Sequence, residues 1–383
     1  MKKIICGIYD TLLRCFRRML TRLFWIFPIN NNQIMAWNFF GNGYGCNSKY
    51  IYNYILSNSM PFKLVWAVKE YGEFPESVKQ VKIYSLKYFY YLAKSKVLID
   101  NQHKNHNFVK RKKQYFIKTW HATLGLKKIG TDNPEFTEKL REVLLWNNSI
   151  TDLMISNCDY ITKKFRRVFL YTGEILECGF PRTDILLEND ENVKKKLLEK
   201  IGIKNKRVLL YAPTFRSDLG TDCYDVDLER LLQVLEGISK DNWIAIVKLH
   251  PHLADKKMYQ NSNDILDLTG YDDIQELMAI SDVLITDYSN VMFEFALTKR
   301  PVFLYCKDYN QYKEQRGYLF DLKELPFDCS LTNDELVDCI YSFDAERYKE
   351  KVEDFFGRIG FEEKPNSSQL LVNRITEICN KTY

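Results

Sequence analysis

A turn of polar residues at positions 287–290 lies between a short apolar run and a stretch with helical periodicity. Residues 283–286 are predicted to form a buried strand and residues 291–298 the start of a helix, so the turn leaves free backbone N–H groups at the positive end of the helix dipole. In α/β enzymes phosphate is held at such a place. Ser289 and Asn290 could add side-chain hydrogen bonds. An ordinary helix cap stays open as the alternative, because Ser, Asp and Asn are also the preferred capping residues.

Further candidates for nucleotide recognition lie near the ends of predicted strands. Glu294, one turn into the same helix, could reach the hydroxyls of a ribose. Thr214 and Arg216 come at the carboxyl end of a predicted strand, and Arg182 lies in a turn fixed by a proline. Because arginine can hold phosphate through two parallel hydrogen bonds, both arginines are candidate phosphate clamps. Arg182 could equally hold a domain boundary through Asp184.

Two histidines follow predicted strands in different parts of the chain. His121 comes after the predicted strand 115–120 and shares its loop with Thr123, while His250 ends the predicted strand 243–249. Imidazole is the side chain best matched to proton transfer near neutral pH, and a well-placed base contributes about 10²–10⁴ in rate. We expect the two imidazoles to face one site. For either histidine alone, a structural role stays open.

No metal site is firmly expected. Asp282, Asp287 and Glu294 could assist a Mg²⁺ ion, but no ligand cluster demands one, and a Mg²⁺ dependence stays open. The ten cysteines are scattered, without a C-x-x-C pair or a Cys/His spacing that suits zinc. This pattern favours small buried thiols in a reducing compartment.

The composition is that of a folded protein whose excess charge lies at one end. Of 383 residues, 46% are hydrophobic and 14% aromatic, which fits a globular chain. The net charge of +5 equals the excess within residues 1–35, so the rest of the chain is neutral overall. Because nucleic-acid binding usually needs a basic face on the folded body, no nucleic-acid partner is expected.

The N-terminal arm, residues 1–30, is predicted to be an amphipathic helix. Apolar residues recur at steps of three and four: Ile5, Ile8, Leu12, Phe16, Leu20, Leu23 and Phe27. Arginines interrupt this run too often for a transmembrane span or a signal-peptide core. The pattern favours a helix in the membrane interface with its arginines on anionic headgroups, and hence a peripheral protein on the cytoplasmic side of the cell membrane. A helix packed on the protein's own body is the alternative.

Beyond the arm, strand and helix patterns alternate, which predicts an α/β protein with mostly parallel sheets. Residues 31–188 are expected to form one Rossmann-like domain and residues 200–360 a second, followed by a C-terminal helix at 361–383. Ligands of such sheets bind beyond the carboxyl ends of the strands. The candidate residues should therefore face a cleft between the two domains.

The motifs together resemble one family. Residues 120–123 (WHAT) with residues 126–130 (LKKIG) resemble the tryptophan-histidine-glycine-threonine motif of the CDP-glycerol glycerophosphotransferases of wall teichoic acid and capsule synthesis. The remaining motifs of that family look like residues 179–184, 211–216, 248–251 and 286–296, in the same order. The likeness covers residues 33–330, and the set is specific although no single motif is.

The resemblance implies a two-domain fold of the glycosyltransferase-B type and phosphoryl transfer from CDP-glycerol or CDP-ribitol to a polyprenyl-diphosphate-linked saccharide. It implies that His121 is the base on the acceptor hydroxyl and that His250 helps to hold the diphosphate while CMP leaves. Glu294 would bind the cytidine ribose. The expected substrate-binding residues are Thr123, Arg182, Thr214, Arg216, Asp287, Ser289, Asn290 and Glu294.

The chain departs from the family pattern in places. Ala122 stands where the motif usually has glycine, Leu124-Gly125 replaces a threonine-proline-leucine continuation, and Asn290 replaces a second serine. Without the long N-terminal extension of the polymerising members, an enzyme that adds one or a few units, of primase or capsule type, is expected. Two other functions stay open: a glycosyltransferase of the same fold that uses a nucleotide sugar, and a non-catalytic protein that binds membranes or polyanions.

Overall fold

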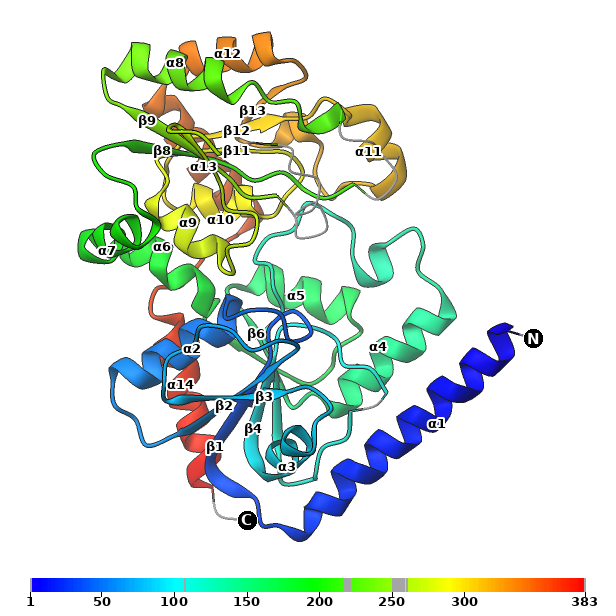
Figure 1. Cartoon of the computed structure of the whole chain (residues 1–383). Coiled ribbons are helices and arrows are strands. Elements are labelled where there is room, and N and C mark those ends of the chain that lie inside the picture. Colours follow the sequence, from blue (N-terminus) through cyan, green and yellow to red (C-terminus); the bar gives the residue numbers. More distant parts are fainter. Residues whose placement is uncertain (1, 107, 217–221, 250–258, 260, 382–383) are drawn as a thin grey trace.

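Two β-sheets, one in each half of the chain, organise the molecule (Figure 1). The computed structural model describes residues 2–106, 108–216, 222–249, 259 and 261–381. Within these residues every pairing between strands is parallel, and the one antiparallel contact is an isolated bridge between Lys127 and Tyr318. Helices cover the sheets, so the fold is of the α/β class.

The sheet of the N-terminal half has the strand order β3-β2-β1-β4-β5-β6-β7 in the described residues. Its strands are β1 (Asn30–Ala36), β2 (Lys63–Val68), β3 (Val78–Lys82), β4 (Ser95–Asp100), β5 (Tyr115–Lys118), β6 (Leu153–Ser156) and β7 (Glu174–Glu177). All residues of β4 are buried, as is usual where helices cover both faces of a parallel sheet. The order of the strands reverses between β1 and β4, at the switch point where sheets of this kind bind ligands.

The sheet of the C-terminal half repeats this arrangement, with the order β10-β9-β8-β11-β12-β13 in the described residues. Its strands are β8 (Arg207–Tyr211), β9 (Trp243–Val247), β10 (Ile265–Asp267), β11 (Val283–Thr286), β12 (Val302–Tyr305) and β13 (Asp328–Ser330). The apolar run that precedes the polar turn is β11, which pairs with β8 and β12 in the middle of the sheet. The switch point of this sheet therefore lies between β8 and β11.

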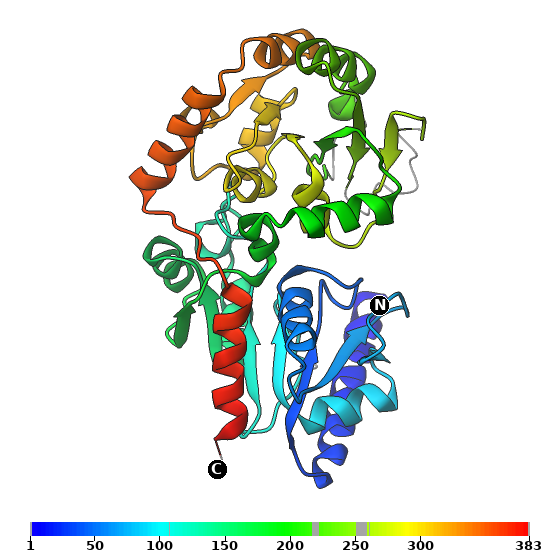
Figure 2. The same ribbon diagram turned by 90° about the vertical axis from the view of Figure 1, so that its left-hand side faces the viewer.

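Helices connect the strands, and the last one crosses back to the first half. The N-terminal half carries α2 (Cys46–Ser57), α3 (Leu86–Lys94), α4 (Glu138–Ile150) and α5 (Asp159–Val168), followed by α6 (Asp184–Glu188) and α7 (Glu191–Ile201). The C-terminal half carries α8 (Leu228–Ser239), α9 (Ile274–Ile280), α10 (Val291–Ala296), α11 (Tyr309–Arg316), α12 (Asn333–Tyr341) and α13 (Ala345–Ile359). The C-terminal helix expected at 361–383 is α14 (Ser367–Asn380), which packs against α2, β1 and β4 (Figure 2).

The N-terminal helix α1 (Lys2–Leu23) lies along the N-terminal half and contacts α3 (Figure 1). On its inner side the guanidinium of Arg17 lies 3.6 Å from the ring centre of Tyr84, and Thr21 is buried. The outer side exposes large apolar side chains, among them Tyr9, Leu12, Phe16, Met19 and Leu23. In the described part of the chain no helix combines the length and the apolar character needed to cross a membrane.

The two halves meet at the carboxyl ends of their strands. In the loop between β1 and α2, the backbone N–H of Tyr44 donates to Asp272 at 3.2 Å, and in the first turn of α2 Lys49 forms an ion pair with Asp273 at 2.8 Å. Gly43 has a φ of +62°, and a Cβ at this position would lie 2.5 Å from Asp272, so the close approach requires glycine. Residues that follow strands of one sheet therefore contact residues that follow strands of the other.

Candidate functional site

His121 lies shortly after β5, beside the junction of the two halves. Its Nδ1 is 3.1 Å from the backbone oxygen of Asn101 and 3.3 Å from the side-chain amide nitrogen of Gln102. The contact with Asn101 is the shorter one, and a carbonyl oxygen can only accept, so the tautomer that satisfies it carries the proton on Nδ1 and leaves Nε2 as an acceptor. Burial lowers the pKa of the imidazole to about 4, and the charges of Arg182 and Lys118 act in the same direction. At neutral pH the ring is uncharged, and Nε2 can take a proton.

The loop that carries His121 is fixed from two sides. Trp120 has a φ of +58°, a left-handed value that is uncommon for residues other than glycine. Its ring packs against those of His121 and Phe169, with ring centres 4.3 and 4.6 Å apart. From the opposite side, the guanidinium of Arg182 donates to the backbone oxygen of His121 at 2.6 Å. Packing and this hydrogen bond together hold the imidazole in one orientation.

The polar turn before α10 contacts the same loop. The backbone N–H of Leu126 donates to Oδ1 of Asn290 at 3.2 Å and joins the loop to the start of α10. The helix has six residues and ends earlier than the sequence predicts. The N–H groups of Met292 and Phe293 bond back to Ser289 and Asn290, so the N–H groups just before them have no acceptor within the helix. On the loop side, Thr123 is buried, and its hydroxyl has no partner among the described residues.

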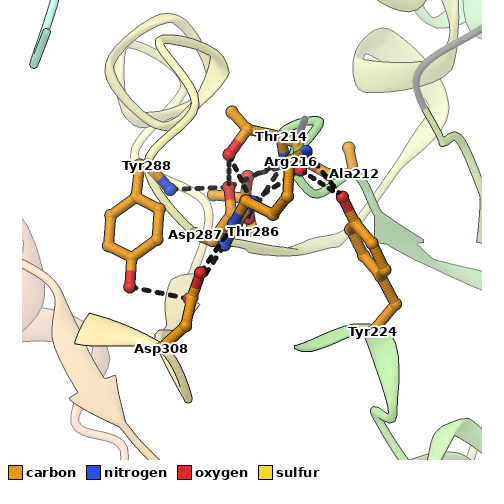
Figure 3. A network of polar contacts seen from close by, with 8 residues as sticks. All are labelled: Ala212, Thr214, Arg216, Tyr224, Thr286, Asp287, Tyr288 and Asp308. Atoms are coloured by element: carbon orange, nitrogen blue, oxygen red, sulfur yellow. Dashed lines mark hydrogen bonds and ion pairs between the residues drawn. The ribbon is translucent and has the colours of Figure 1, made fainter. Parts of the chain in front are cut away.

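Thr214, Arg216 and Asp287 form a closed polar network at the carboxyl ends of β8 and β11 (Figure 3). Nη1 of Arg216 lies 2.5 Å from Asp287, while Nε and Nη2 lie 2.8 and 3.0 Å from the two oxygens of Asp308. Thr214 donates its backbone N–H and its hydroxyl to Asp287, both at 2.9 Å. Burial opposes the charge of the guanidinium, but the two carboxylates outweigh it and raise the pKa of Arg216.

This network suggests a different role for Arg216 from the phosphate clamp that the sequence predicts. Each nitrogen of its guanidinium already contacts a carboxylate, and one cation faces two anions, so the group carries a net negative charge. The two carboxylates thus offset the charge that a phosphate would otherwise meet on this guanidinium. Asp287 also accepts from the backbone N–H of Tyr288 at 2.6 Å, so the network fixes the backbone that leads into Ser289. The contacts support a positioning role for Thr214, Arg216 and Asp287.

Arg182 and Glu294 form a buried ion pair across the junction. Nη2 of Arg182 lies 2.7 Å from Oε2 of Glu294, which is fully buried. Oε2 also accepts from Gln275 at 2.6 Å, and Oε1 has no partner among the described residues. The sequence left two roles open for Arg182, a phosphate clamp or a contact that holds a domain boundary through Asp184. Arg182 does form a contact across the junction, but its partner there is Glu294 and not Asp184. That carboxylate accepts from the backbone N–H groups of the first two residues of α14, at 2.9 and 2.7 Å.

One cation at the junction is missing from the sequence-based candidates. Lys164 of α5 is buried, and both its Nζ and Oδ1 of Asn290 lie 3.6 Å from the point that a Cβ on Gly125 would occupy. Burial lowers the pKa of Lys164 to about 8, and among the described residues no carboxylate forms an ion pair with it. The sequence signal that could have identified Lys164 as a candidate is its position between Ile161 and Phe165, on the buried face of an amphipathic helix.

The remaining expectations concern a second histidine and a metal. His250 lies outside the described residues, so its convergence with His121 stays a prediction. The three carboxylates considered for Mg²⁺ do not come together, because Asp282 accepts from a backbone N–H of β8 while Asp287 and Glu294 pair with different arginines. In the portion of the chain that the structure describes, no three His, Cys, Asp or Glu residues are arranged to hold a metal ion.

The fold and the site define a class of protein. Two parallel sheets that meet at the carboxyl ends of their strands, with a neutral imidazole between them, are features of α/β group-transfer enzymes. Within that class, this chain belongs to the CDP-glycerol:poly(glycerophosphate) glycerophosphotransferase family, whose model matches residues 19–377.

Relatives and solved structures of this family match nearly the whole chain. A teichoic acid poly(glycerol phosphate) polymerase of Bacillus spizizenii is 28% identical over 98% of this chain and 100% of its own length. A teichoic acid glycerol-phosphate transferase of Staphylococcus aureus is 30% identical over 90% of this chain and 93% of its own length. The structure of the wall teichoic acid polymerase TagF superposes with a TM-score of 0.83 at 27% identity, covering 99% of this chain and 97% of that one. Because a relative of matching length is named a polymerase, length does not separate primases from polymerases here.

Proposed function

We propose that this protein transfers glycerol phosphate or ribitol phosphate from a CDP-alditol to a hydroxyl group of a lipid-linked saccharide or growing polymer and releases CMP. The observation that carries the proposal is the neutral imidazole of His121, fixed through Asn101 in a loop that contacts the polar turn at Asn290. Membership of the glycerophosphotransferase family supplies the type of donor. The choice between the two alditols rests on the experiment below.

His121 acts as the general base in this proposal. The acceptor hydroxyl gives its proton to Nε2 while its oxygen attacks the phosphorus that bears the alditol. A new P–O bond forms, the bond to the CMP oxygen breaks, and CMP leaves with the electron pair. Because Nδ1 is committed to Asn101, the proton has only one ring nitrogen to go to.

The donor is held by groups that no carboxylate neutralises. Ser289, Asn290 and Lys164 supply a hydroxyl, an amide and an ammonium beside the start of α10. Oε1 of Glu294, the oxygen without a partner, accepts from a ribose hydroxyl when the two halves part to admit the nucleotide. Thr123, whose hydroxyl also lacks a partner, completes the site on the acceptor side.

The chain forms two Rossmann-like domains of the glycosyltransferase-B type in this proposal. Residues 31–188 bind the acceptor, and residues 200–360 bind the CDP-alditol. The helix in 361–383 belongs with the first domain, because α14 packs against α2 and β1. The helix α1 attaches the enzyme to the cytoplasmic side of the membrane. One side of α1 packs on α3 and the other exposes apolar side chains beside arginines, which suits an anionic lipid surface.

The test is CMP release from CDP-glycerol and CDP-ribitol in separate reactions, each with a lipid-linked disaccharide as acceptor. We expect turnover with one of the two donors and a loss of about 10²–10⁴ in kcat for His121→Asn. His106→Asn is the matched control, because His106 stacks on Trp146 and takes no part in the proposed reaction. Turnover of UDP-sugars only would favour a glycosyltransferase instead. Membrane binding without any turnover would favour a non-catalytic protein.

A further inference from the structure

A cavity of about 460 Å³ lies in the N-terminal half, near the loop that carries His121. Its walls come from residues that follow β1, β2, β3 and β4, together with α1 and α3. It therefore includes the switch point between β1 and β4, where sheets of this kind bind ligands. A volume of this size falls within the range of about 300–1,000 Å³ that small-molecule sites occupy.

The lining combines aromatic faces with a few fixed polar groups. Trp37, Phe40 and Tyr84 contribute rings. Lys104 lies 3.4 Å from the ring centre of Trp37 and is held there by an ion pair of 2.6 Å with Asp100. Phe40 is exposed, whereas cations already cover one face of Trp37 and of Tyr84. An exposed ring next to charged groups that can bond with hydroxyls suits a saccharide better than a purely apolar ligand.

His121 does not itself line this cavity, but residues of the cavity wall lie next to residues that contact it. His103 lines the cavity, and its ring centre lies 5.4 Å from that of Trp120, which stacks on His121. On the other side, Oδ1 of Asn101 accepts from the backbone N–H of Phe39 at 3.0 Å, while the backbone oxygen of the same asparagine accepts from His121. The ring of Phe39 lies 5.6 Å from the imidazole, and the next residue, Phe40, lines the cavity.

The opposite wall is the helix α1. Thr21 lines the cavity, and Arg17, one turn earlier, stacks on the lining residue Tyr84. The outer side of the same helix exposes Phe16, Met19 and Leu23. A molecule anchored in a lipid surface against this outer side would thus have its polar end next to the cavity, with His121 beyond it.

We propose that this cavity binds the saccharide of a membrane-anchored acceptor and presents its hydroxyl group to Nε2 of His121. The inference rests on the proposed function and locates its acceptor site. The groups assigned to the donor lie beside the start of α10, and none of them lines this cavity.

The experiment uses Phe40→Asn in the full-length protein. Phe40 is 57% exposed with a φ of +61°, a conformation that asparagine tolerates, so the substitution removes a ring without new backbone strain. Tyr71→Asn is the matched control, because Tyr71 is 65% exposed and does not line the cavity. Initial rates are measured with a short-chain prenyl-diphosphate disaccharide and with the alkyl glycoside of the same disaccharide. Thermal unfolding of each variant verifies folding.

For Phe40→Asn we expect the KM for both acceptors to rise about tenfold, with the KM for the CDP-alditol unchanged. The control leaves every constant unchanged. An unchanged acceptor KM in an active, folded variant would overturn the proposal, and so would a shift confined to the donor KM. A rise with the diphosphate acceptor alone would also overturn it, because the cavity would then recognise the diphosphate and not the sugar. Absence of CMP release by the wild-type protein would instead refute the proposed function itself.

Discussion

The ion pair between Arg182 and Glu294 allows a quantitative test of how the two halves are held together. Glu294→Gln keeps the shape of the side chain and removes its charge, while Arg182→Met removes the opposite charge. In the single Glu294 variant the guanidinium stays buried without its carboxylate. In the double variant neither charge remains.

The expected magnitude follows from the geometry. At a separation of 2.7 Å between Nη2 and Oε2, the Coulomb attraction is about 6 kcal/mol for an effective dielectric constant of about 20. Desolvation of both groups offsets much of this gain, and removal of one partner from a buried pair typically costs about 3–5 kcal/mol. We therefore expect each single variant to lose about 3–5 kcal/mol of unfolding free energy. The double variant should lose clearly less than the sum, by a coupling energy of about 2 kcal/mol or more.

The assay is equilibrium unfolding in urea, followed by circular dichroism and tryptophan fluorescence so that two-state behaviour is verified by two probes. Glu138→Gln serves as the control, because Glu138 forms an exposed ion pair with Arg141 at 3.2 Å, and such pairs contribute little. A coupling energy below about 0.5 kcal/mol would refute the reasoning. It would show that the two charges do not stabilise each other across the junction.

Three other changes have defined outcomes. Gly179→Ala should lower the unfolding free energy by about 2 kcal/mol more than Gly202→Ala. Both glycines have a φ of +88°, but only a Cβ on Gly179 would meet another residue, at 2.2 Å from Ser367. Equal losses of unfolding free energy in urea would contradict this. Burial lowers the pKa of the Lys118 amine to about 7, from 10.5 in the unfolded chain. Above pH 10.5 the amine is neutral in both states, so the stability is complete there, and it is lost as the pH falls from 10.5 toward 7 because only the unfolded chain takes up the proton. The stability of wild type relative to Lys118→Met, measured by urea unfolding, should rise by about 1.4 kcal/mol per pH unit in that window, and a flat difference would argue against it. If Lys164 holds the diphosphate, kcat/KM for the CDP-alditol should fall above about pH 8, because the lysine then loses its charge. Lys164→Arg should remove that fall, because arginine keeps its charge. A fall of kcat/KM above about pH 8 that persists in the Lys164→Arg variant would exclude this role.

The central strands were predictable from the sequence because they are continuous apolar runs between polar residues. The predicted range 283–286 coincides with β11, and the predicted ranges 115–120 and 243–249 begin with β5 and β9, which each end two residues earlier than predicted. Edge strands give no such signal. β3 (VKQVK), β10 (ILD) and β13 (DCS) are short or half exposed, since one side of an edge strand faces no neighbouring strand.

The positions of the candidate residues were predictable, but their partners were not. Residues that follow parallel strands must gather at one edge of a sheet, so the sequence could bring Asn290 and the His121 loop into one region. Which carboxylate neutralises an arginine depends on tertiary contacts. Arg182 is two residues from Asp184 in the chain, yet it pairs with Glu294, 112 residues away. Asp184 instead accepts a hydrogen bond from the backbone N–H at the start of α14, a helix near the C-terminal end of the chain.

The commitment of both arginines to carboxylates has a consequence for how the enzyme turns over. A guanidinium that bound the diphosphate equally well before and during transfer would lower KM without raising kcat, because such binding is uniform. Arg182 and Arg216 contact carboxylates, and burial lowers the pKa of Lys164. In the proposed reaction, Lys164 and the neutral donors near Asn290 hold the donor less tightly than an arginine clamp would and stand where charge develops as the bond to CMP breaks. Because the same groups hold CMP only weakly after transfer, its release need not limit the rate.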